Sequence, residues 1–176
     1  MKKRLWLGLA CVGLVSGPLV GSAGIPAAAA TVQRSGISST DWLAEINYYR
    51  AGSGLEAVTD DTAWDQGIAN HIVYLEKTPA KYYVGEYQSL HTENPQSPYY
   101  TPSGAQEAAS SDLFEGLVGA TPTQFINGWL AAPFHAIGML RAQLQQVAFD
   151  SDPVSGDAGL DVISKCVRSN SPQAPW

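Results

Sequence analysis

Cysteine is scarce in this chain, and its scarcity limits how the fold can be held together. The 176 residues include two cysteines, Cys11 and Cys166. Cys11 lies in an N-terminal segment that we expect to be removed, so Cys166 would have no partner within the chain. We therefore predict a fold stabilised by packing alone. The remaining thiol is then either buried or paired with another molecule, and we favour burial.

Long apolar runs are also missing. The N-terminus has a basic start, a short apolar run that is interrupted at Pro18, and small residues up to Ala30. These are the three parts of a signal peptide, and the run is too short to span a bilayer. Cys11 comes too early to be the attachment site of a lipoprotein. We predict a signal peptide over 1–30 and a secreted, extracellular protein with no transmembrane segment after cleavage.

Basic residues are few, which restricts the partners. The chain has 10 Lys and Arg against 16 Asp and Glu, for a formal charge of −6. The expected cleavage removes Lys2, Lys3 and Arg4 and no acid, which lowers the charge to −9. Nucleic acids and anionic membrane surfaces both attract basic proteins. We therefore expect no nucleic-acid partner.

Familiar catalytic signatures are absent as well. After residue 30 there is no Gly-x-Ser-x-Gly elbow and no His-Glu-x-x-His motif, and no cysteine-protease motif surrounds Cys166. Nucleophilic catalysis needs a base placed against the nucleophile, and no such pair is visible. We expect binding rather than catalysis.

What the chain does have is helical periodicity in its first third. Capping residues predict one helix from Thr40 and a second after Asp61. The second helix carries an apolar stripe at helical spacing, formed by Trp64, Ile68, Ile72 and Leu75. His71 lies in this stripe, so we interpret it as a packing residue with satisfied hydrogen bonds.

The second half changes character. Residues 79–111 are rich in Tyr and Pro and lose helical periodicity, so we predict a long loop there. Another helix opens at Thr121 and is stopped by Pro133, which places His135 at the start of the next turn. Strands are predicted over 145–149 and 159–164. Helices and hairpin-connected strands in separate runs indicate the α+β class.

These elements fit one domain over residues 40–164. A Ser- and Gly-rich lead-in precedes it over 31–39, and a tail of irregular composition follows it over 165–176. We see no internal repeat.

Four segments together resemble the CAP superfamily, or SCP domain, which includes cysteine-rich secretory proteins, antigen 5 and plant pathogenesis-related proteins. Residues 42–50 and 54–58 resemble its opening "Leu-Asn-x-x-Arg … Gly-Leu-x-x-Val". Residues 69–75 are similar to "Ala-x-His-x-x-Tyr-Leu". Residues 128–135 are similar to the bacterial "Gly-Trp-Met-x-Ser-Pro-x-His", and 144–149 stand where the family has "Ile-Gly-Val-Gly".

The resemblance implies an α-β-α sandwich with a central antiparallel sheet and an open cleft. In the family the cleft is lined by two histidines and two acidic residues, and in some members it binds a divalent metal. His135 matches the second histidine, and His91 is the expected first one.

The expected acidic residues have no clear counterparts. The family's "Gly-Glu-Asn-Leu-Ala" strand corresponds to residues 110–114, which puts Ser111 where the glutamate would stand. The second acid has only Asn127 or Gly128 near its place. Glu93, and after it Glu107, are the nearest substitutes by sequence.

The resemblance therefore implies a secreted, non-enzymatic CAP-type binding protein with a cleft around His91 and His135. Its ligand would be a small apolar molecule, such as a lipid or sterol, or a cell-surface partner. Tyr99, Tyr100 and Trp129 would line an apolar groove. No cofactor is required, although the two histidines could bind zinc or magnesium weakly.

Two alternatives stay open. The first is a divalent-metal-dependent hydrolase, with His91 and His135 as ligands, Glu93 as third ligand or base, and a metal-bound water as nucleophile. The second is a degenerate copy that folds but carries no site.

Overall fold

The computed structural model describes Ser38 and residues 40–166. The predicted signal peptide over 1–30 lies outside these residues, as do most of the lead-in over 31–39 and most of the tail over 165–176. In the described part, no helix is long and apolar enough to cross a membrane.

The described residues form an α+β fold, which confirms the predicted class. In chain order the elements are α1 (Trp42–Gly52), β1 (Thr59–Asp60), α2 (Thr62–Lys77), the short 3-10 helices η1 (Ala80–Tyr82) and η2 (Gly85–Gln88), α3 (Pro102–Ser110), β2 (Ser111–Phe114), α4 (Pro122–Ala131), α5 (Pro133–Met139), β3 (Gln146–Asp152) and β4 (Asp157–Asp161).

The four strands form one sheet in the order β1-β3-β4-β2. The pairs β3–β4 and β2–β4 are antiparallel, whereas β1 runs parallel to β3. The predicted antiparallel pairing therefore holds for β3, β4 and β2, but the parallel strand β1 makes the sheet mixed. The physical reason is that β1 has two residues and reaches its place beside β3 only through tertiary packing, which no local pattern encodes.

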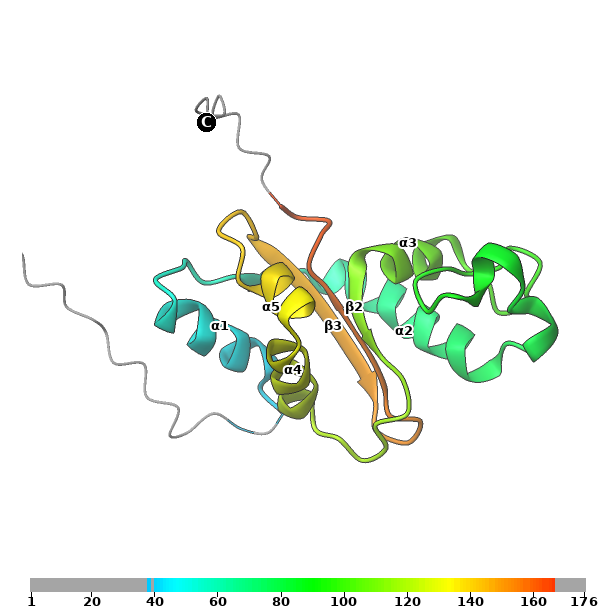
Figure 1. The fold of residues 1–176 in the computed structure, drawn as a ribbon, viewed down its shortest axis with the longest axis horizontal. Helices are drawn as coiled ribbons and strands as arrows, with labels where there is room; N and C mark the ends of the chain where they lie inside the picture. The colour runs from blue at the N-terminus through cyan, green and yellow to red at the C-terminus, as the bar shows by residue number, and fades with distance from the viewer. Residues whose placement is uncertain (1–37, 39, 167–176) are drawn as a thin grey trace, which may run out of the picture.

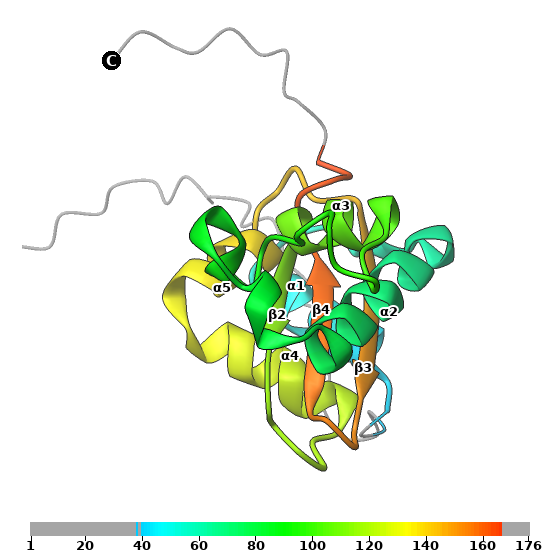
Figure 2. The same cartoon turned by 90° about the vertical axis from the view of Figure 1, so that its right-hand side faces the viewer.

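Helices lie against both faces of the sheet. Figure 1 shows α1, α4 and α5 on one side of the strands and α2 and α3 on the other. Seen from the α2 side, α2 and α3 lie in front of the strands (Figure 2). The larger core joins the α1–α4–α5 side to the sheet and includes Ile46, Phe125, Ile126, Trp129, Met139, Phe149 and Leu160. A smaller core joins Ile68 and Ile72 of α2 to Ala148 of β3.

The helix starts follow their capping signals. Asp41 accepts a hydrogen bond from the backbone N–H of Ala44, and Thr121 forms a capping box with Gln124. The same device explains a helix that we did not predict. Within the expected loop over 79–111, Thr101 caps α3 and proline fills the first helical position.

The last described residues pair with the segment before β3. Leu144 forms an isolated antiparallel bridge with Cys166, and the N–H of Gln145 donates to the carbonyl of Lys165. Cys166 is a half-buried free thiol that packs against the core, so it is less buried than we predicted. This isolated bridge lies two residues beyond the predicted domain end at 164.

Arg50 ties α1 to the segment that follows α5. Its side chain is fully buried, and its guanidinium donates to four backbone carbonyls, those of Glu56, Met139, Arg141 and Leu144. One turn earlier, the Asn47 side chain donates to the carbonyl of Val58 and accepts from its N–H. These bonds hold the connector after α1 in place, and Arg50 also fixes the end of α5, which carries His135.

Candidate functional site

His135 and Asp112 form the centre of the candidate site. Pro133 begins α5 directly after α4 ends, and this corner places His135 over strand β2, where Asp112 lies. The His135 Nδ1 and Asp112 Oδ1 atoms are 2.7 Å apart. The His135 side chain is 37% exposed and that of Asp112 is 13% exposed, so the pair lies at the surface with its carboxylate turned inward. The sequence did identify His135, but it did not identify its partner.

The carboxylate comes from the residue after the one that we predicted. Ser111 pairs with Asp161 in the sheet, whereas Asp112 pairs with Leu160. Because successive strand residues face opposite sides, Ser111 faces the α2–α3 side and Asp112 faces His135. Ser111 is buried and its Oγ has no hydrogen-bond partner. The structure therefore brings Asp112, and not the predicted Ser111, to His135, because in a strand a shift of one residue reverses the side.

His91 lies close enough to this pair for its charge to act on Asp112. The His91 side chain is exposed, and its Nδ1 donates to the carbonyl of Ala108 in α3 at 2.9 Å. A carbonyl only accepts, so this Nδ1 carries the hydrogen. Among the described residues, no hydrogen bond engages Nε2 of His91 or of His135. Both rings therefore present a lone pair on Nε2 when they are neutral.

Asp112 has an electrostatic environment unlike that of an ordinary surface acid. Burial raises its pKa, and the hydrogen bond and charge of His135, followed by the charges of His91 and Arg141, partly offset this rise. The second carboxylate oxygen, Oδ2, is buried without a hydrogen-bond partner. Of the two carboxylate oxygens of Asp112, Oδ1 therefore has His135 as its partner, whereas Oδ2 has none among the described residues.

Glu93 does not join this site. Its Oε1 lies 2.9 Å from Nδ1 of His71, and its Oε2 accepts the N–H of Thr101. The other ring nitrogen of His71 bonds the carbonyl of Leu90 at 2.9 Å. Glu93 and His71 are both buried, so their pair anchors the segment before α3 to α2. His71 is the satisfied packing residue that its stripe predicted, whereas the structure does not bring Glu93 to His91.

The remaining predicted site residues are also elsewhere. Glu107 is buried between α3 and the sheet, where it interacts with Asp161, and its Oε1 accepts a long hydrogen bond of 3.5 Å from the Gln106 side chain. Trp129 is 1% exposed in the core, where its indole N–H donates to the carbonyl of Leu113, so it lines no surface groove. Its helical spacing with Phe125 is that of a core stripe. Tyr99 and Tyr100 lie partly exposed just before α3.

The helix that carries His135 also exposes two large apolar side chains. Phe134 and Ile137 precede and follow His135 on α5, three positions apart, and they are 88% and 66% exposed. Side chains at this spacing share one face of a helix. Phe134 and Ile137 therefore form an exposed apolar strip on the same helix as His135, which the motif alone did not reveal.

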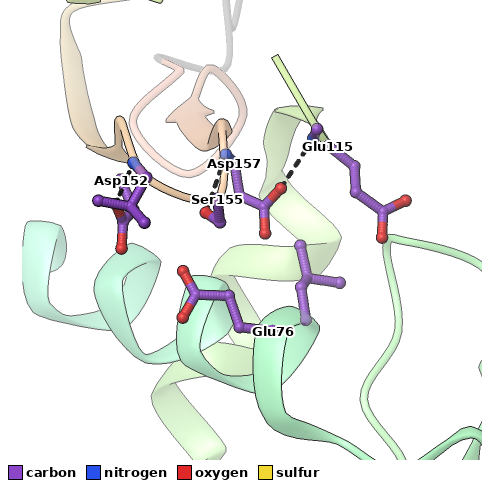
Figure 3. A pocket seen from close by; sticks show the side chains of 8 residues that line it. Glu76, Glu115, Asp152, Ser155 and Asp157 are labelled. Carbon is purple, nitrogen blue, oxygen red and sulfur yellow. Dashed lines mark hydrogen bonds between the residues drawn. The ribbon is translucent and has the colours of Figure 1, made fainter. Parts of the chain in front are cut away.

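A pocket lies away from the histidines. It has a volume of about 450 Å³ and is formed by the end of α2, the residues after β2 and the β3–β4 hairpin. Figure 3 shows four carboxylates around it, those of Glu76, Glu115, Asp152 and Asp157. Asp157 is held in place because its Oδ1 accepts the N–H of Gly116. This pocket is lined by acidic side chains, whereas the groove predicted from the sequence would be lined by aromatic ones.

Within residues 38 and 40–166, no group of three or more His, Cys, Asp or Glu side chains could hold a metal ion. The residues that are present therefore do not fit a catalytic zinc site, which needs three protein ligands and an open position.

Comparisons with protein-family models, with curated proteins and with solved structures found no match to this chain.

Proposed function

We propose that the chain is a secreted, non-enzymatic binding protein of the CAP type, whose site is formed by His91, Asp112 and His135. Its ligand is a small, mainly apolar molecule with one polar group, such as a sterol or a lipid. The observation that carries the proposal is the His135–Asp112 pair at 2.7 Å, which supplies a histidine and an acid, and the helix of His135 also carries the exposed Phe134 and Ile137.

The arrangement of the fold supports the CAP-type proposal. Helices on both faces of the sheet are what an α-β-α sandwich requires. The segments that carried the resemblance also contact one another: Asn47 bonds Val58, and Arg50 bonds Glu56. Asp112 provides the strand acid that the resemblance implies and that Ser111 does not provide.

The ligand class follows from the chemistry of the surface. An apolar body can cover Phe134 and Ile137, and removing their surface from water favours binding. A hydroxyl or similar group can then accept from or donate to Nε2 of His135, whose ring is oriented by Asp112. The exposed patch is small, so we expect modest affinity.

Saturation binding of a fluorescent sterol and of a fluorescent fatty acid tests this proposal. The double variant Phe134→Ser/Ile137→Ser is expected to weaken binding by about tenfold or more, since two apolar contacts are lost. Val154→Ser is the matched control, because Val154 is an equally exposed aliphatic residue, at 81%, on the β3–β4 hairpin. Absence of saturable binding to either probe, or equal loss in the control, would contradict the proposal.

Zinc binding provides a separate test of the two histidines. With Nδ1 of His91 on a carbonyl and Nδ1 of His135 on a carboxylate, both rings are oriented as metal-bound imidazoles usually are. We expect weak binding by calorimetry that disappears in His91→Ala/His135→Ala and falls about 10- to 100-fold in Asp112→Asn. The hydrolase alternative loses its proposed third ligand, since Glu93 bonds His71, and we derive no reaction for it.

A further inference from the structure

A pair of buried carboxyl groups joins α3 to the sheet. Glu107 of α3 is 3% exposed and Asp161 of β4 is 1% exposed. Glu107 Oε2 and Asp161 Oδ2 are both buried, and neither has a hydrogen-bond donor among the residues that the structure describes. Two such orphaned oxygens on interacting groups need an explanation, because a buried acceptor without a donor destabilises the fold.

One proton satisfies both oxygens at once. A protonated carboxyl donates a hydrogen bond to a carboxylate, and such a bond between Glu107 and Asp161 would give both buried oxygens a partner. Asp161 is the natural acceptor, because its Oδ1 already accepts the N–H groups of Ile163 and Ser164 while its Oδ2 has no donor. Glu107 then holds the proton.

The surroundings favour the same assignment. Around Glu107, the charge of Asp61 from the start of α2 adds to that of Asp161, and Lys165 is occupied by Asp61 at 3.6 Å. Burial, followed by the charge and hydrogen bond of Asp161, raises the pKa of Glu107 to about 8.

Within residues 40–166, the elements packed around Glu107 add no free counter-charge to it. One turn before Glu107, Gly104 of α3 packs against Glu93, whose charge is engaged by His71 of α2. From β2, the residue that faces this side is the neutral Ser111.

We propose that Glu107 and Asp161 share one proton inside the protein, and that loss of this proton loosens α3 from the sheet at alkaline pH. Two ionised carboxylates cannot remain in contact in a buried place without strong repulsion. Gly67 of α2 packs directly on the Glu107 stem, so the side chain has little room to turn away. The remaining response is movement of α3 itself.

Movement of α3 would also move the residues of the site at His91 and Asp112, because α3 is linked to each of them. The carbonyl of Ala108, one residue after Glu107, holds the His91 ring, and α3 leads directly into β2 and Asp112. The carbonyl of Ser110 also accepts the N–H of Val162, next to Asp161. The proton thus stabilises the spacing between His91 and Asp112. This inference does not depend on any ligand.

The experiment measures unfolding by urea between pH 6 and 9. Burial raises the pKa of Glu107 from the ordinary value of 4.5 to about 8. Between these two pH values Glu107 keeps its proton in the folded state but loses it in the unfolded state. Stability is therefore highest at low pH in this window and falls as pH rises, with the unfolding constant increasing up to about tenfold per pH unit. Glu107→Gln keeps the shape and donates permanently to Asp161, so this pH slope should be lost. Glu76→Gln, at an exposed position in α2, should retain it.

Infrared spectroscopy of the unmodified protein provides an independent readout. A carbonyl band of a protonated carboxylic acid should be present at pH 6.5 and absent at pH 9.5, as well as absent in Glu107→Gln. Amide hydrogen exchange in α3 should accelerate over the same range, and the ring signals of His91 should shift with it. An unchanged pH slope in Glu107→Gln, or no protonated carboxyl at pH 6.5, would overturn the proposal.

Discussion

Replacing Arg50 should destabilise the fold more than any other single change to a basic residue described here. Arg50→Ala leaves the carbonyls of Met139 and Leu144 buried without their donors. Each unsatisfied buried acceptor costs about 1–3 kcal/mol, and a small cavity adds to this cost. Burial lowers the pKa of Arg50, which shows a desolvation cost that the variant recovers. We expect a net loss of about 4 kcal/mol.

Urea unfolding monitored by tryptophan fluorescence and by circular dichroism would measure this loss. In thermal unfolding it corresponds to a decrease in Tm of about 10 °C or more. Arg50→Lys keeps the charge but concentrates its donors on one atom, which cannot reach carbonyls on several sides, so at least half of the loss should persist. Lys77→Ala is the control, because Lys77 also occupies the last turn of a helix but is exposed. A loss below about 1 kcal/mol in Arg50→Ala would refute the reasoning.

Two further substitutions test the loops. Gly156→Ala should cost about 3 kcal/mol in urea unfolding, because Gly156 has a φ of +80° and a Cβ there would lie 2.2 Å from the backbone of Leu117. Gly52→Ala, where nothing lies within 4 Å, should be neutral or slightly stabilising, and an equal loss in both would contradict the steric reason. Asn47→Ala should cost about 2 kcal/mol by removing both bonds to Val58, and retention of full stability would show that these bonds contribute little.

Local signals predicted the helices well. The cap at Asp41, the Thr121–Pro122 start and the break at Pro133 depend on residues that are adjacent in the chain, so the sequence contains the whole cause. The same logic predicts α3 from Thr101 and Pro102. We missed it because three prolines and several tyrosines nearby hid the helical spacing.

Pairing between distant segments was not predictable in the same way. The parallel alignment of β1 with β3 joins residues near 60 and 147, and no local pattern encodes it. The acid that pairs with His135 depends on strand register, where one residue decides between Ser111 and Asp112. Glu93 lies two residues from His91 in sequence, yet its partner is His71, 22 residues away. Burial decided that pairing, since an isolated buried charge needs a partner.

The short outer strands of the sheet have a consequence for association between copies of the chain. Exposed strand edges are templates on which other chains add and aggregate. Here β1 offers two residues before the backbone turns into α2, and β2 offers four, with a charged side chain at its second position. Neither edge offers a long, flat, uncharged ladder. The sheet is thereby protected against edge-to-edge polymerisation, and Asp112 contributes to this protection whether or not a ligand ever binds beside it.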